Sequence, residues 1–230
     1  MPALISQDGR WWWDGRVWRS RLVEGPLDLF WFTTTPEWFE RVALIGLIGL
    51  IPIVGAINLY GWVLVATDMV RQRWRELPPA GFQYLERGVA PFLVLFVYGL
   101  IAALVLGSLI TGTVLLLVYR TDSVALVVVF VFVAVLVLIA WWLASLYLLA
   151  AVLVGADKLG IARALNPLRL LGLANKNSRV SLQVALTYFV ATLVIVAAGT
   201  VPLGGLVAVV VLPAVYALFV PRLAEFQVEG

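Results

Sequence analysis

The sequence predicts an all-α integral membrane protein with about six transmembrane helices in three hairpins, preceded by a small β-hairpin. Of its 230 residues, 63% are hydrophobic and only 13% are charged, which is more apolar surface than a water-soluble domain of this size could bury. A helix crosses about 30 Å of hydrocarbon in roughly 20 residues. Four intervals are long enough for one or two such crossings and carry no charged side chain: residues 42–67, 88–119, 123–156 and 180–221.

The first interval allows two interpretations. "RVALIGLIGLIPIVGAINLYGWVLVATDMVRQRW" could form one span kinked at Pro52 or a hairpin that turns at "IPIVG". The hairpin places fifteen of the sixteen Lys and Arg residues on one side of the membrane and only Arg120 on the other, whereas a single span divides them ten to six. Because cytoplasmic loops carry the excess of basic residues, the hairpin is favoured. It predicts that both termini are cytoplasmic and that the turns near residues 54, 121 and 203 face outward.

The two middle intervals each predict one long helix, joined by the short turn "RTDS". Both helices exceed the minimum span and should tilt or project beyond the bilayer. If hydrocarbon begins near Val124, Trp141 and Trp142 lie about 26 Å deeper, close to the opposite interface, where Trp is favoured. We expect the apolar residues 143–154, beyond that interface, to be covered by other segments of this chain or by a partner, since they would otherwise expose a large apolar patch.

The last interval is too long for one span. "GTVPLGG" divides it, because Pro202 and the paired glycines favour a turn, and helices are expected at about 180–199 and 205–221. The predicted organisation is a cytoplasmic Trp-rich segment over 1–36, a transmembrane domain over 37–222 and a short cytoplasmic tail over 223–230.

Two cytoplasmic stretches, residues 76–88 and 157–180, have the pattern of interfacial amphipathic segments. In the second, Arg163 and Arg169 alternate with leucines, and the polar residues 175–177 could cap the next helix. Arg163 and Arg169 are predicted to meet anionic lipid, with a protein partner as the alternative.

The composition limits the chemistry. The chain has no cysteine and no histidine, so thiolate and imidazole ligands for metals and haem are absent, and neither a cofactor nor a metal site is predicted. No nucleophile and base pair is recognisable, which argues against an enzyme. Asp68 comes closest to membrane depth, either as a proton relay or, as favoured here, as a surface pair with Arg71. The basic residues flank the predicted spans, and topology explains them without a nucleic-acid partner.

The N-terminal stretch "DGRWWWDGRVWRS" predicts a β-hairpin. Asp14-Gly15 is a preferred two-residue turn, and the flanking residues favour strand. It looks like the short Trp-rich "WWDG" element found at the ends of many bacterial membrane and secreted proteins. An isolated ribbon is barely stable, so its tryptophans need a surface: either the headgroup layer of the membrane or a protein partner. The interface residues predicted here are Trp11, Trp12, Trp13 and Trp18.

A longer part of the chain suggests a family. "PEWFERVALIGLIGLIPIVGAINLYGWVLVATDMVRQRWRELPP" resembles the start of a prokaryotic multi-pass membrane family called domain of unknown function 4013, and "ALNPLRLLGLANKNSRVSL" is similar to the link before its final helix pair. The resemblance covers about residues 36–222. It implies a multi-pass fold and no activity.

Two hypotheses of function follow. The first is a non-catalytic structural or accessory subunit of a larger complex in the plasma membrane, with the lipid bilayer and other proteins as its partners. The alternative is a transporter, channel or lipid-handling protein whose pathway lies between the helix pairs. An enzyme ranks third.

Overall fold

The computed structural model describes residues 11–13, 18–20, 31–33, 35–72, 74, 76–119, 124–200 and 204–228. Its elements, in chain order, are β1 (Trp11–Trp13), β2 (Trp18–Ser20), α1 (Trp38–Gly49), α2 (Val54–Arg71), α3 (Leu85–Tyr119), α4 (Val124–Leu159), α5 (Ile161–Ala164), α6 (Pro167–Lys176), α7 (Ser178–Gly199) and α8 (Gly204–Glu225).

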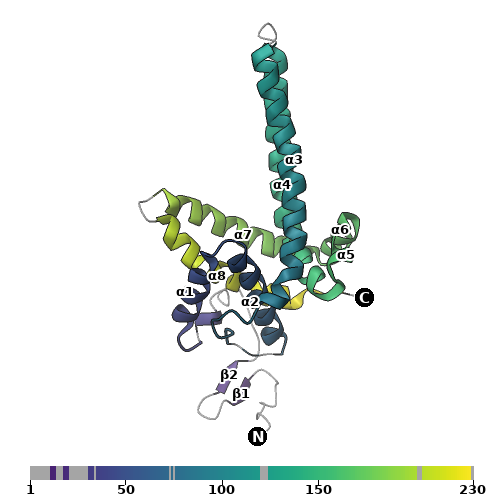
Figure 1. Ribbon diagram of the computed structural model, residues 1–230. Coiled ribbons are helices and arrows are strands. Elements are labelled where there is room, and N and C mark those ends of the chain that lie inside the picture. The colour runs from purple at the N-terminus through teal and green to yellow at the C-terminus, as the bar shows by residue number, and fades with distance from the viewer. Residues whose placement is uncertain are drawn as a thin grey trace.

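Helices α3 and α4 lie side by side as a long pair, here called the stalk, which rises from a base formed by the other helices (Figure 1). In the described part of the chain, three segments are long and apolar enough to cross a membrane: Leu85–Leu115, Ala125–Leu159 and Ser178–Ala197. The structure is therefore helical and suited to a membrane, and three of the six predicted crossings have helices of the required length and composition.

The first charge-free interval is divided into two helices. Helix α1 ends at Gly49 and α2 begins at Val54, with the turn at the predicted "IPIVG" stretch, so the chain does not continue as one kinked helix. Helix α1 has 12 residues and is about 18 Å long at 1.5 Å per residue. It is shorter than the hydrocarbon thickness.

The base has one packed core. Large side chains from most of the helices and from the loop after α2 are fully enclosed in it, among them Trp62 of α2, Leu77 of the loop, Leu153 of α4 and Phe219 of α8. Trp31 also belongs to this core, and its indole nitrogen donates a hydrogen bond to the Ala217 carbonyl over 2.8 Å. The packed part of the protein thus begins before residue 37, where the sequence placed the domain boundary.

Helices α2 and α3 cross at very short range. A Cβ atom at Gly61 would overlap the carbonyl oxygen of Tyr84, and one at Gly88 would overlap the carbonyl oxygen of Ile57. Only glycine allows the two backbones to approach this closely. The crossing fixes the start of the stalk against the base.

The third helix pair diverges from the stalk. Helix α7 leaves the lower part of the stalk at a wide angle, and α8 returns beside it to the centre of the base (Figure 1). The predicted break near Pro202 agrees with the helix ends at Gly199 and Gly204. In the polar cluster 175–177 that was predicted to cap α7, the Asn177 side chain bonds elsewhere: its amide donates to the carbonyls of Leu173 and Gln227, and its oxygen accepts from the Gln227 amide. Asn177 therefore anchors the C-terminal segment.

Candidate functional site: a membrane-facing stalk and its border

The upper part of the stalk is bare. On α4, residues 125–145 are all exposed or half-buried, and burial begins at Leu146. Among the described side chains of α3, the last buried one is Ala102. At 1.5 Å per residue, the bare part of α4 is about 30 Å long, which matches the hydrocarbon thickness of a bilayer.

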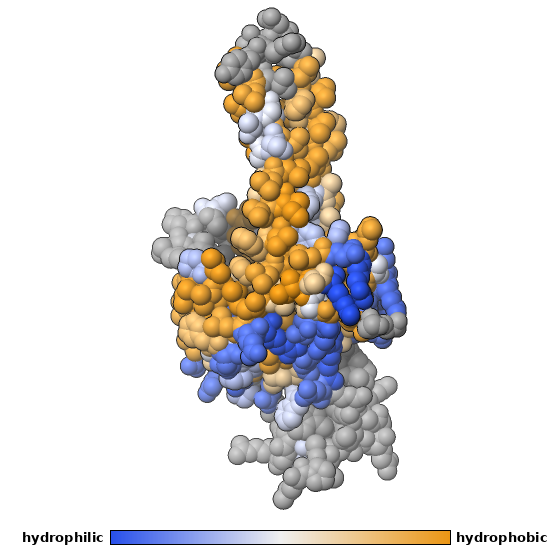
Figure 2. Space-filling view, turned by 45° about the vertical axis from the view of Figure 1, so that its right-hand side comes forward, coloured by the Kyte–Doolittle hydropathy of each residue, from blue (hydrophilic) through white to orange (hydrophobic). Residues whose placement is uncertain are grey.

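The side chains of this bare part are apolar. Figure 2 shows an apolar surface along the stalk and a band of hydrophilic residues around the base below it. The exposed side chains include Leu104, Ile110 and Val118 on α3, and Val128 and Phe132 on α4, each about three-fifths exposed or slightly more. Such a surface is stable in lipid and would be an aggregation hazard in water.

The lower part of α4 is covered by the chain itself. Leu149, Leu153 and Val154 are buried, and α4 contacts α2, α5, α6 and α7 along this part. The prediction that residues 143–154 are covered is confirmed from Leu146 onward, and the cover comes from segments of this chain.

Aromatic side chains mark the border between the bare and covered parts. Trp142 is partly exposed, and its ring lies 5.3 Å from that of Phe189 on α7. The Tyr98 hydroxyl donates to the Leu165 carbonyl over 3.2 Å, and the Tyr147 hydroxyl lies 2.9 Å from the Asn175 side-chain oxygen and donates to it. Trp and Tyr are enriched where hydrocarbon meets headgroups, so these residues agree with a membrane surface at this level.

The predicted basic interface residues lie just at this border. Arg163 is in α5 and Arg169 in α6, and both are exposed. The N-terminus of α6 is capped, because the Asn166 side chain accepts hydrogen bonds from the backbone amides of Leu168 and Arg169. Pro167 occupies the first turn, where its missing N–H costs nothing. Pro167 begins this helix.

The predicted tryptophans occupy the two short strands. β1 and β2 pair antiparallel, with Trp13 opposite Trp18 and Trp12 opposite Arg19. The turn predicted at Asp14-Gly15 lies outside the described residues, as do the side chains of Trp11, Trp12 and Trp18. The surface that these tryptophans contact therefore stays a prediction.

A charged cluster, which the sequence analysis only partly anticipated, closes the bottom of the stalk. Asp68 pairs with Arg71 over 3.2 Å, as predicted, and also with Arg87 of α3. Arg87 forms a two-pronged pair with Asp157 of α4, with both N–O distances at 2.9 Å, and Lys158 lies 3.3 Å from Asp157. A carboxylate paired with basic side chains from two other helices is suited to holding those helices together.

The same cluster reaches the C-terminus. Arg71 donates to the carbonyls of Leu223, Ala224 and Phe226 at the end of α8 over 3.0 to 3.3 Å. The last carbonyls of a helix carry partial negative charge, so a cation near them is favourable. Four helices are thus joined at one level of the base.

The loop between α2 and α3 is tied to the same region. Tyr84 is buried, its hydroxyl donates to the Pro79 carbonyl, and the Trp62 indole donates to the Pro78 carbonyl. Burial raises the pKa of Tyr84 above its usual value, so its hydroxyl keeps its proton and remains a donor. The loop that follows Pro78 is held as part of the core.

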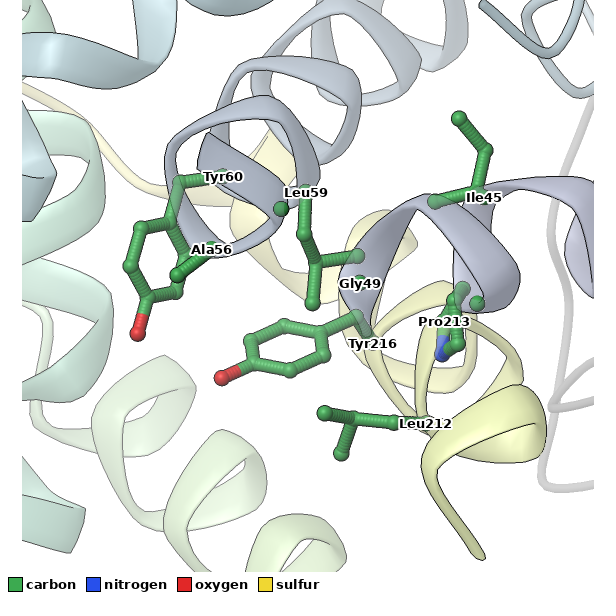
Figure 3. A pocket seen from close by; sticks show the side chains of 10 residues that line it. Ile45, Gly49, Ala56, Leu59, Tyr60, Leu212, Pro213 and Tyr216 are labelled. Atoms are coloured by element: carbon green, nitrogen blue, oxygen red, sulfur yellow. The ribbon is translucent and has the colours of Figure 1, made fainter. Parts of the chain in front are cut away.

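One apolar pocket of about 110 Å³ lies between α1, α2 and α8. In Figure 3 the hydroxyls of Tyr60 and Tyr216 point to the same end of this pocket, away from Ile45 and Pro213. The two rings are in edge contact at 6.1 Å. The pocket could take a small apolar group, such as the end of an acyl chain.

Among the described residues, no group of three or more His, Cys, Asp and Glu side chains could hold a metal ion. No family model, curated protein or solved structure matches this chain.

Proposed function

We propose that the protein is a non-catalytic subunit of a larger complex in the plasma membrane, anchored by the stalk. The observation that carries this proposal is the bare part of the stalk, which is apolar on its surface and as long as the hydrocarbon is thick. A helix pair with this surface needs lipid or other membrane helices around it.

The proposed crossing differs from six crossings in three hairpins. Helix α1 is too short to cross alone, and α7 leaves the stalk at a wide angle (Figure 1), so both cannot run parallel to the stalk through one bilayer. In this proposal α3 and α4 cross, and the exposed apolar ends of the α1–α2 and α7–α8 pairs dip into the leaflet next to the base. Exposed residues of these ends include Leu50, Ile53, Val194 and Val196.

This arrangement keeps nearly all Lys and Arg residues on one side of the membrane. All Lys and Arg residues except Arg120, which lies between α3 and α4, belong to the base or to the segments before and after it. By the positive-inside rule the base, and with it both termini, faces the cytoplasm.

The role as a subunit is supported by the N-terminal segment. It contains tryptophans and arginines, the residue types that most often anchor protein interfaces, and its Trp31 is buried in the core of the base. A partner bound by this segment would therefore be held close to the cytoplasmic face of the membrane.

The size of the native particle tests this proposal. After extraction in a mild detergent, the chain should comigrate with other subunits in a fixed ratio. A homogeneous monomer or homo-oligomer would contradict the role as an accessory subunit.

A paired substitution locates the contact. Changing Trp12 and Trp18 to Ala should leave membrane insertion intact and weaken association by roughly 2 kcal/mol or more, as expected for a hot spot. Co-purification of the double variant at the wild-type ratio would contradict a partner contact through these two tryptophans.

A lipid-handling role is the second candidate, and the apolar pocket beside Tyr60 and Tyr216 favours it. Gly49 lines this pocket and has open space where a side chain would begin. If the pocket holds an acyl chain, Gly49→Phe should displace lipid that co-purifies with the protein. Unchanged lipid content in this variant would argue against that role.

A further inference from the structure

The segment that contains α5 and α6, residues 160–177, lies at the level where the stalk becomes bare. It folds back from the end of α4 and is fastened at two points, through Tyr98 to Leu165 and through Tyr147 to Asn175. Tyr98 is close to the last buried residue of α3, and Tyr147 directly follows Leu146, the first buried residue of α4. The segment therefore borders the part of the stalk that the proposed function places in lipid.

One face of α6 packs on the stalk. Leu170, Leu173 and Ala174 are buried, and the side chains of Leu170 and Leu173 lie beside Gly155 of α4. On the remaining surface two leucines are left uncovered: Leu168 is 77% exposed and Leu171 is 42% exposed. Leu168 in particular contributes little to the packing of the base.

The exposed surface of α6 has an apolar edge and a basic edge. Residues seven apart lie on one face of a helix, so Asn175 shares the edge of Leu168, whereas Lys176 shares the edge of Arg169, about 100° away. The buried face of α6 lies beside Gly155 of α4, whereas Asn175 contacts Tyr147 of α4. Tyr147 is eight residues before Gly155 and therefore about 12 Å nearer to the bare part of the stalk. The leucine edge therefore faces the bare part, and the basic edge is turned away from it.

The segment carries positive charge only. Between Asp157 and Glu225 the sequence contains no acidic residue, while Arg163, Arg169, Lys176 and Arg179 are all exposed. No described residue forms an ion pair or a hydrogen bond with the side chain of Arg163 or Arg169. These two guanidinium groups are available to a ligand, and their charge requires an anionic one.

An apolar pocket adjoins the leucine edge. It has a volume of about 160 Å³ and is lined by Pro167 of α6 together with Leu95 of α3 and Trp141, Ala144 and Leu148 of α4. It lies at the border marked by Tyr98 and can receive part of an acyl chain whose headgroup lies on the segment.

We propose that residues 160–177 form a binding surface for anionic phospholipids. Arg163 and Arg169 bind the headgroup phosphates, Leu168 and Leu171 enter the upper acyl region, and an acyl chain lies in the pocket beside Pro167 and Trp141. This inference rests on the proposed membrane crossing by the stalk. The occupant is the surface of the bilayer, because leucines that face the hydrocarbon and arginines at the level of the headgroups form the arrangement of an interfacial helix.

Single-cysteine labelling tests the depth of the segment, and the absence of native cysteine makes the labelling specific. Leu168→Cys, Arg169→Cys and, as a control in the bare stalk, Ile110→Cys would each carry a nitroxide in nanodiscs of phosphatidylcholine and phosphatidylglycerol. We expect the probes at 110 and 168 to be relaxed by oxygen, which concentrates in hydrocarbon, and the probe at 169 by a water-soluble nickel chelate.

The control separates the two proposals. A probe at 168 relaxed by nickel while the probe at 110 is relaxed by oxygen would overturn the lipid surface and leave the crossing intact. Relaxation of both by nickel would overturn the crossing. A probe at 168 that neither reagent reaches would show that a protein covers the segment, and this result would also overturn the lipid surface.

Lipid selectivity gives a second readout. In nanodiscs that contain spin-labelled phosphatidylglycerol or phosphatidylcholine, the protein should retain the anionic lipid preferentially, and each of Arg163→Gln and Arg169→Gln should lower that preference by roughly fivefold. Arg222→Gln, whose side chain pairs with Glu225 outside this segment, is the matched control and should change nothing. Equal preference in all three variants would overturn the role of the two arginines.

Discussion

Arg87 and Asp157 show how an antiparallel helix pair brings distant charges together. The two residues are equally far along the chain from Asp122, which lies between α3 and α4 in the sequence. In an antiparallel helix pair, residues equidistant from the turn lie level with each other, so this contact could have been found from the sequence. The partnership of Asp68 with Arg71 was predicted because three residues on one helix suffice for it. Its extension to Arg87 depends on how α2 crosses α3, and no local pattern encodes that crossing.

Replacing Asp157 by Asn should destabilise the base. Arg87 is about one-quarter exposed and Asp157 about one-tenth, so the loss of their paired hydrogen bonds should cost roughly 1 to 3 kcal/mol. The exposed pair of Arg222 and Glu225 is the control, and Arg222→Gln should cost under about 1 kcal/mol. Thermal unfolding of both variants in detergent measures the difference, and equal melting temperatures would contradict a structural role for the cluster.

Gly88 and Gly99 lie on the same helix in opposite surroundings. A side chain at Gly88 would overlap the backbone of α2, whereas nothing lies within 4 Å of a Cβ at Gly99. Gly88→Ala should therefore lower the melting temperature by forcing α2 and α3 apart. Gly99→Ala should leave it unchanged or raise it, since Ala is favoured over Gly in a helix by about 1 kcal/mol. A neutral Gly88→Ala variant would refute the close crossing.

At the scale of helices, the sequence located most of the boundaries. The predicted turns at "IPIVG", "RTDS" and "GTVPLGG" separate helices that begin and end within a few residues of the expected positions, because Pro, Gly and charged residues in apolar sequence interrupt helices strongly. The packing between helices was less predictable. The wide angle of α7 and the return of α5 and α6 along the stalk depend on shape complementarity between side chains, such as Leu170 beside Gly155.

Helix α4 has two halves with different surroundings, and one type of substitution can compare them. Leu153 is fully buried, whereas Leu136 is half exposed on the bare part. Leu153→Ala should cost about 2 to 5 kcal/mol in unfolding free energy, because it leaves a cavity in the base. Leu136→Ala should cost much less, since it removes contacts mainly with lipid or detergent. Similar losses for both variants would mean that the bare half also packs against protein.

At the scale of the molecule, the protein combines a packed base with an unpacked pair of long helices. Composition alone indicated a membrane protein, and the length of the middle intervals indicated that the pair would project beyond the bilayer. Hydropathy does not predict how a helix is oriented: α7 has the composition of a spanning helix and leaves the stalk at a wide angle (Figure 1). The resemblance to domain of unknown function 4013 stays a prediction.

The central claim is that α3 and α4 alone cross the membrane, with the base on the cytoplasmic side. Labelling of intact cells by a thiol reagent that does not pass membranes tests it most directly, with single cysteines at Asp122 in the stalk turn, Thr200 at the end of α7 and Glu225 at the end of α8. The account predicts that only the cysteine at 122 is labelled in intact cells and that the one at 225 is labelled after permeabilisation. Labelling at 200 from outside as strong as at 122 would show that α7 crosses as well, and labelling at 225 from outside would place the base on the opposite side.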